Sequence, residues 1–200
     1  MCIRDRYTGT SAAIIGVSGS GKTTLLQCLA GLDLFDSGNN NLCGIILNKS
    51  SIKNIDELLN KNVGFIYQKS HLLPDFSVIE NIAMPLLISG VSRAEAIEKA
   101  LKILDSIQLK NKKHLLPHQL SGGMQQKVAI ARACIHKPKI IFADEPTGNL
   151  DNKSRDEITE LLLNLNKEHN ISLCVVTHDN NVAIKLDNIY RIENKTIIKT

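Results

Sequence analysis

The sequence predicts a single α/β domain, spanning residues 1–200, with a mainly parallel β-sheet and an inserted helical region. Four apolar runs carry this prediction. Each is continuously apolar instead of alternating with polar residues, which is typical of strands buried on both faces of a parallel sheet. The runs are residues 11–17, 63–67, 139–143 and 173–177. A helical pattern at residues 22–30 follows the first run, as the alternation of strand and helix requires.

Residues 69–120, between the second and third runs, are expected to form an α-helical subdomain that ends at a serine-glycine motif. Ser92 and Glu95 have the spacing of a capping box at a helix N-terminus. Apolar residues then recur on one helical face, at Ile97, Leu101, Leu104 and Ile107. Packing against the rest of the domain explains this stripe better than a cofactor role.

Composition and charge exclude several functional classes. The 24 basic and 20 acidic residues are scattered and give a net charge of +4, without the basic block of a nucleic-acid arm. No nucleic-acid partner is therefore expected. No apolar run approaches the ~20 residues of a spanning helix, so any link to a membrane should run through a partner. The five cysteines lack metal-ligand spacing, and neither a disulfide nor zinc is expected.

A glycine-rich loop joins the first apolar run to the helix at residues 22–30. Its glycines let successive backbone N–H groups point inward at a helix N-terminus, which is how proteins bind phosphate. In this pattern Lys22 reaches the β- and γ-phosphates, and Thr23 binds Mg²⁺. The residues expected to bind ATP here are Gly16, Val17, Ser18, Gly19, Ser20, Gly21, Lys22, Thr23 and Thr24.

Two adjacent carboxylates, Asp144 and Glu145, end the third apolar run. Charge at the end of a buried strand is costly unless a partner uses it, and a Mg²⁺–phosphate cluster is the obvious partner. A solvated strand end is the weaker alternative, because four apolar residues lead into the pair.

Ser121, Gly122 and Gly123 are expected to open a second helix with its own ring of N–H donors. Within one domain, a single triphosphate cannot bind both these N–H donors and those of the glycine-rich loop.

The phosphate loop comes before the motif that begins at Leu120, and Asp144–Glu145 comes after it. With its motifs in this order, the chain resembles the ATP-binding cassette (ABC) ATPases from about residue 12 to residue 200. The resemblance implies a P-loop NTPase fold and hydrolysis of ATP. It also implies a head-to-tail dimer, in which Ser121, Gly122 and Gly123 close over ATP held by the phosphate loop of a second copy. Asp151, in the D-loop, would cross that interface.

The resemblance also assigns catalytic roles. Glu145 matches the general base that polarises the attacking water, and Asp144 matches the aspartate that orients Mg²⁺. Gln68 matches the Q-loop glutamine that contacts metal and water, and His178 matches the switch histidine that binds the γ-phosphate. Lys22 completes the catalytic set, while Thr23, Gln68 and Asp144 are the expected metal ligands.

Residues near Gln68 look like those of the ATP-binding subunit of lipoprotein-releasing (Lol) transporters. They are residues 64–68, 71–76, 80–88 and 144–151. This resemblance implies integral membrane permease subunits as partners, docked on residues 70–87, and lipoprotein as the indirect substrate. It places the chain at the cytoplasmic face of a bacterial inner membrane.

Two alternatives share much of the pattern: ATPases that drive macrolide export, and cell-division ATPases that act as adaptors. DNA-repair relatives insert a long coiled coil after the Q-loop glutamine, and translation relatives carry two cassettes. Here only about fifty residues separate Gln68 from Ser121, and a single cassette is present.

The front end departs from the family. Relatives place two strands and an adenine-stacking aromatic residue before the phosphate loop, whereas only fifteen residues precede Gly16. We expect these strands to be missing and residues 1–10 to be a truncated front end. Tyr7 is too close to the loop to stack on adenine.

Overall fold

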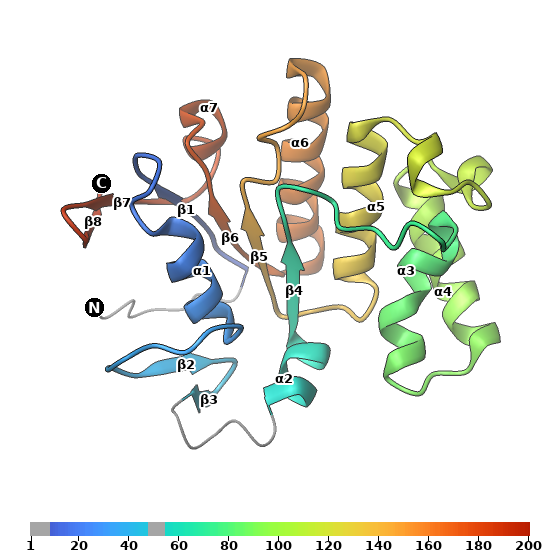
Figure 1. The fold of residues 1–200 in the computed structure, drawn as a ribbon, viewed down its shortest axis with the longest axis horizontal. Helices are drawn as coiled ribbons and strands as arrows, with labels where there is room; N and C mark the ends of the chain where they lie inside the picture. The colour runs from blue at the N-terminus through green and yellow to red at the C-terminus, as the bar shows by residue number, and fades with distance from the viewer. Residues whose placement is uncertain (1–8, 48–54) are drawn as a thin grey trace.

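The structure is a computed structural model that describes residues 9–47 and 55–200. Its centre is a six-stranded sheet in the order β4-β5-β6-β1-β7-β8, parallel except for the last pair (Figure 1). The strands are β1 (Ser11–Ile15), β4 (Val63–Ile66), β5 (Ile140–Asp144), β6 (Ser172–Val176), β7 (Asn188–Glu193) and β8 (Thr196–Lys199). The prediction of a mainly parallel sheet is therefore confirmed. β1 ends two residues earlier than predicted, because the glycine-rich loop begins at Gly16.

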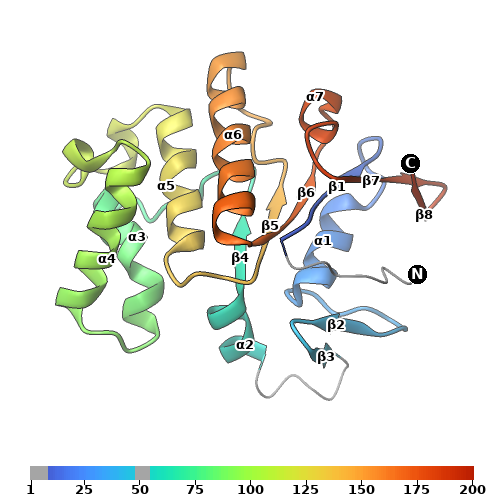
Figure 2. The ribbon, with the colours of Figure 1, turned by 180° about the vertical axis from the view of Figure 1, so that it is seen from behind.

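Helices cover both faces of this sheet (Figures 1 and 2). α1 (Lys22–Ala30) lies on one face, and α5 (Gly122–Cys134) and α6 (Asn152–His169) lie on the other. Neighbouring residues of one strand accordingly pack in different layers: Ile14 joins the α1 side, while Ala13 and Ile15 join the α5–α6 side. Burial on both faces is the reason these strands are continuously apolar.

Residues 69–120 contain two helices that lie beside α5, away from the sheet (Figure 1). They are α3 (Val78–Ile88) and α4 (Arg93–Ser106), followed by the short 3-10 helices η2 (Lys110–Lys112) and η3 (Pro117–Gln119). Ser92 caps α4 by accepting from Glu95 N at 3.3 Å. Leu104 and Ile107 are buried as expected, whereas Ile97 and Leu101 are only partly buried and the neighbouring Ala96 and Ala100 are fully buried. The boundaries of a separate helical subdomain stay a prediction.

Smaller elements complete the chain. The hairpin of β2 (Asn40–Leu42) and β3 (Ile45–Leu47) and helix α2 (Ile55–Asn62) precede β4, and α7 (Asn180–Ala183) follows β6. No helix among residues 9–47 and 55–200 is long and apolar enough to cross a membrane. Our expectations for Tyr7 and the rest of residues 1–8 lie outside the described residues.

The end of α5 is fixed closely against β4. A Cβ on Gly64 would lie 2.7 Å from Ala133 O, so only glycine allows this approach. His136, just after α5, lies 3.2 Å from Val63 O through Nε2, while its buried Nδ1 has no hydrogen-bond partner among the residues that the structure describes. Burial lowers the pKa of His136, and the Val63 contact offsets this only in part.

The free energy of unfolding should therefore fall as the pH drops below about 6.5, the ordinary histidine pKa. The unfolded chain binds a proton there before folded His136 does, so stability is fully present above that pH and is lost below it. Urea unfolding at pH 7.5 and 5.5 measures the difference in the free energy of unfolding between the two pH values. This difference should shrink in His136→Gln and persist in His118→Gln, which alters an exposed histidine. An unchanged difference in His136→Gln would refute the assignment.

Candidate functional site

The loop between β1 and α1 can bind an anion. Gly19 and Gly21 have φ of +77° and +89°, so they curl the backbone in a way that other residues rarely allow. Gly21 begins α1 without a side-chain cap, and the first turn of the helix contains no acidic residue. The unpaired N–H groups and positive dipole end of α1 are thus open to a phosphate.

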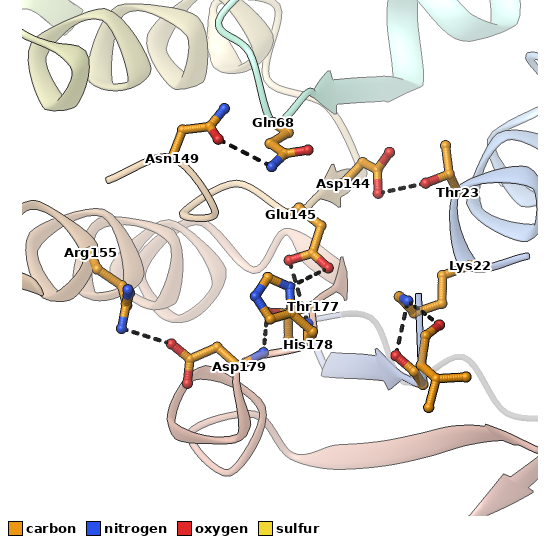
Figure 3. A network of polar contacts seen from close by, with 12 residues as sticks. Lys22, Thr23, Gln68, Asp144, Glu145, Asn149, Arg155, Thr177, His178 and Asp179 are labelled. Atoms are coloured by element: carbon orange, nitrogen blue, oxygen red, sulfur yellow. Dashed lines mark hydrogen bonds and ion pairs between the residues drawn. The ribbon is translucent and has the colours of Figure 1, made fainter. Parts of the chain in front are cut away.

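Lys22 and Ser20 place further polar atoms in this loop. Lys22 is 8% exposed, and its Nζ donates to Gly16 O and Val17 O, each at 2.9 Å (Figure 3). Ser20 Oγ, close to Gly16, is buried with no hydrogen-bond partner among the described residues. A buried unpaired hydroxyl is costly, and a polar ligand in the loop would remove that cost.

Thr23 and Asp144 could hold Mg²⁺. Thr23 Oγ1 donates to Asp144 Oδ1 at 3.2 Å, which joins the first turn of α1 to the end of β5 (Figure 3). Burial raises the pKa of Asp144, with a further rise from Glu145, although the Thr23 hydrogen bond lowers it. A bound cation would stabilise the charged form of the Asp144 carboxylate and so offset the effect of burial. The described residues contain no cluster of three His, Cys, Asp or Glu side chains, but Mg²⁺ in nucleotide sites needs only one or two protein ligands beside phosphate and water.

Glu145 and His178 face each other at the ends of β5 and β6 (Figure 3). His178 Nδ1 lies 2.8 Å from Glu145 Oε1, and His178 N donates to Oε2 at 3.4 Å. Glu145 has φ of +46° and donates its N–H to Val176 O, so its backbone is fixed in an unusual conformation next to the sheet. The Glu145 side chain is 15% exposed and that of His178 is 67% exposed. A nearly buried carboxylate held by an imidazole suits a general base.

Gln68 lies beside the D-loop, which we define as residues 149–151. Its Nε2 donates to Asn149 Oδ1 at 3.3 Å, and a Cβ on Gly148 would lie 2.9 Å from that nitrogen. No hydrogen bond joins Gln68 to Thr23 or Asp144 in the described part of the chain. The structure thus brings Gln68 near the carboxylates but does not join it to the proposed metal ligands.

Residues 121–123, which we call the signature turn, form a second group with the D-loop. Ser121 Oγ accepts from Met124 N at 3.4 Å and caps α5. A Cβ on Gly123 would lie 2.8 Å from Ser154 Oγ, and Ser154 donates to both carboxylate oxygens of Asp151, at 3.0 and 2.7 Å. Within residues 9–47 and 55–200 no hydrogen bond connects this group to the phosphate loop. The phosphate loop and the signature turn thus belong to two separate hydrogen-bonded groups within the described residues.

Sequence reasoning missed several residues that support the site. Asn149 and Gly148 lie in a segment that the sequence singled out, but their contact with Gln68 was not expected. Asp179 and Arg155, which pair next to His178, had no motif to indicate them. Asn81 was also missed, although a lone amide within the apolar α3 was a usable signal.

Residues 5–148 match the family described as ABC transporter. Curated relatives are similar over most of the chain. A lipoprotein-releasing system ATP-binding protein, LolD, of Legionella pneumophila is 46% identical over 181 residues, which are 90% of this chain and 80% of that protein. The LolD of Blochmanniella floridana is 50% identical over 182 residues, 91% of this chain and 77% of that protein.

Solved structures agree with this relationship. A dimeric ATP-binding cassette in a post-hydrolysis state, bound to ADP and phosphate, has a TM-score of 0.86 and 35% identity. The match covers 98% of this chain and 87% of that one. A cassette from Clostridium perfringens, part of an ABC transporter complex, has a TM-score of 0.85 and 28% identity over 96% and 76% of the two chains. The fold, the arrangement of the phosphate loop and carboxylates, and these relatives show that the chain belongs to the ABC transporter ATPase family.

Proposed function

We propose that this chain is the ATP-hydrolysing subunit of a membrane transporter that releases lipoproteins. The observation that carries the proposed catalytic activity is that two contacts lie together at the carboxyl ends of the parallel strands. They join Thr23 to Asp144 and Glu145 to His178. The first contact provides oxygen ligands at the phosphate loop, and the second provides a held carboxylate beside it. Water activation next to a bound triphosphate requires both.

Each of these side chains has a defined role in this proposal. Glu145 accepts the proton of the attacking water, and His178 orients Glu145 and reaches the γ-phosphate. Lys22 binds the β- and γ-phosphates, while Gln68 holds the water and senses the membrane partner. Thr23, Asp144 and Gln68 would hold Mg²⁺, which, when bound, neutralises charge on the phosphate oxygens.

The two separated groups of site residues support a head-to-tail dimer. The signature turn and Asp151 would contact ATP bound to the second copy, together with the phosphate loop of that copy. The dimeric cassette of similar structure supports this arrangement. Lipoprotein would be an indirect substrate, moved by permease subunits while the chain stays at the cytoplasmic face of the inner membrane. The relatives named for lipoprotein release support this assignment.

Residues 70–87 are the proposed contact with the membrane subunits, and residues 72–77 within them are called the docking loop. Leu73 and Phe76 in this loop are 37% and 41% exposed. Asn81, which is fully buried, accepts from Leu73 N at 2.8 Å and donates to Leu73 O, Phe76 O and Ser77 O at 2.9 to 3.1 Å. A loop so firmly held can present apolar side chains without collapsing around them, which suits docking more than a solvated turn.

Affinity capture from native membrane tests both the partner and the loop. Leu73→Glu and Phe76→Glu should each weaken capture of the membrane subunits about 30-fold or more, because a charge would enter an apolar contact. Partner-stimulated hydrolysis should fall with it.

Ile184→Glu is the matched control, since Ile184 is 68% exposed at the end of α7, far from the docking loop (Figure 1). Full assembly and stimulation in both loop variants would mean that the loop only packs within the helical layer. Recovery of a cell-division membrane protein, in place of lipoprotein-releasing permeases, would favour the adaptor function.

A further inference from the structure

An ion pair joins α6 to the segment that carries His178. Arg155 Nη1 lies 3.1 Å from Asp179 Oδ2, with side chains 33% and 17% exposed (Figure 3). Asp179 directly follows His178, and Arg155 lies in the first turns of α6. We propose that Arg155 is a positioning residue for ATP hydrolysis, which acts through Asp179 to hold His178 against Glu145. This inference rests on the proposed role of His178.

The backbone on both sides of His178 is anchored, and residues 177–179 are called the switch loop. Thr177 is fully buried, and its N–H donates to Ile14 O at 3.1 Å. Thr177 Oγ1 accepts from Asp179 N at 3.0 Å, and Asp179 Oδ1 accepts from Asn181 N at 2.9 Å. The imidazole itself is mostly exposed, and among the described residues its hydrogen-bond partner is Glu145. Its direction therefore depends on its two neighbours in the chain.

Arg155 links Asp179 to the face that the second copy would contact. Arg155 N donates to Asp151 O at 2.8 Å, and the Asp151 carboxylate caps the same turn through Ser154. Gly123 of the signature turn packs on Ser154. A second copy pressing on the signature turn and D-loop would act on the turn of α6 from which Arg155 extends. The Arg155–Asp179 pair gives that turn a direct contact with the switch loop.

A second ion pair between the same parts of the fold provides a matched control. Asp156, the next residue of α6, lies 3.6 Å from Lys185 Nζ just beyond α7, with side chains 69% and 39% exposed. This pair also ties α6 to the α7 region but does not touch the switch loop. An exposed pair of this kind contributes little to stability.

Steady-state hydrolysis by the full chain tests the inference. Arg155→Ala should lower kcat about 2- to 30-fold and leave the KM for ATP unchanged, because no hydrogen bond or ion pair joins Arg155 to the phosphate loop in the described part of the chain. In a His178→Ala background, Arg155→Ala should lower kcat no further, since both substitutions remove the same function. Asp156→Asn should hydrolyse ATP like the parent. Exchanging the charges, in Arg155→Asp with Asp179→Arg, should restore part of kcat.

Two results for Arg155→Ala would overturn the inference: an equal fold-loss of kcat in both backgrounds, or a parent-like kcat. His178→Ala alone with parent-like hydrolysis would instead refute the role of His178, and the inference with it. Arg155→Gln, which keeps most of the side chain, replaces Arg155→Ala if the latter does not fold. The imidazole NMR signals of His178 should shift in Arg155→Gln and stay in place in Asp156→Asn, whereas unchanged signals in both would contradict the positioning role.

Discussion

Replacing Glu145 by glutamine should lower the rate of ATP hydrolysis about 100- to 10,000-fold, the contribution expected of a general base. Glutamine keeps the size of the side chain and an oxygen that can accept from His178 Nδ1, now 2.8 Å from Glu145 Oε1. It cannot take a proton from water. ATP binding should stay, because Lys22 and the phosphate loop are unchanged, so the variant should accumulate an ATP-bound dimer. Single-turnover hydrolysis and size-exclusion with ATP measure the two effects.

Glu160→Gln makes the same chemical change at an exposed position of α6 and should hydrolyse ATP normally. Hydrolysis by Glu145→Gln near the parent rate would remove Glu145 from the mechanism. A variant that does not fold, or does not bind ATP, would be recognised by size-exclusion, because it would form no ATP-bound dimer.

The parallel strands were predictable because burial on both faces leaves a continuous apolar run, as in β4, β5 and β6. β7 and β8 were missed, because both mix polar with apolar residues and are mostly solvent-accessible: only Ile192 of β7 is buried, and no residue of the edge strand β8 is. α3 was also not delimited, although Ser77 and Glu80 form its capping box. Local patterns thus predicted the strands that are mostly buried, including the edge strand β4, better than the polar strands at the other end of the sheet.

The chemical part of the site was predictable because it depends on short segments. The glycine-rich loop opens α1, and the two carboxylates end β5, where the sequence placed them. The supporting contacts join residues far apart in sequence. Arg155 meets Asp179, and Gln68 meets Asn149, through the packing of whole elements, which no local spacing encodes. The roles of the individual side chains stay predictions that the variants above address.

Ser121→Arg should abolish the ATP-dependent dimer and the hydrolysis that requires it, while a single chain still binds ATP. The signature turn is separated from the phosphate loop of its own chain and lies with the D-loop, so an arginine there should obstruct only the second copy. Association should weaken about 30-fold or more, as expected for bulk and charge introduced at the centre of an interface. Size-exclusion of a Glu145→Gln, Ser121→Arg double variant with ATP measures this effect directly.

The substitution also removes a helix cap, and a control must separate that loss from obstruction. Ser121 Oγ accepts from Met124 N at 3.4 Å, and Ser92 Oγ accepts from Glu95 N at 3.3 Å in the same N-cap role on α4. Losing either cap costs about 1 kcal/mol of stability. Ser92→Arg should therefore destabilise the chain as much as Ser121→Arg but leave the ATP-dependent dimer intact. If both variants lost the dimer equally, helix stability would explain the result; if Ser121→Arg still dimerised, the signature turn could not contact the second copy's ATP.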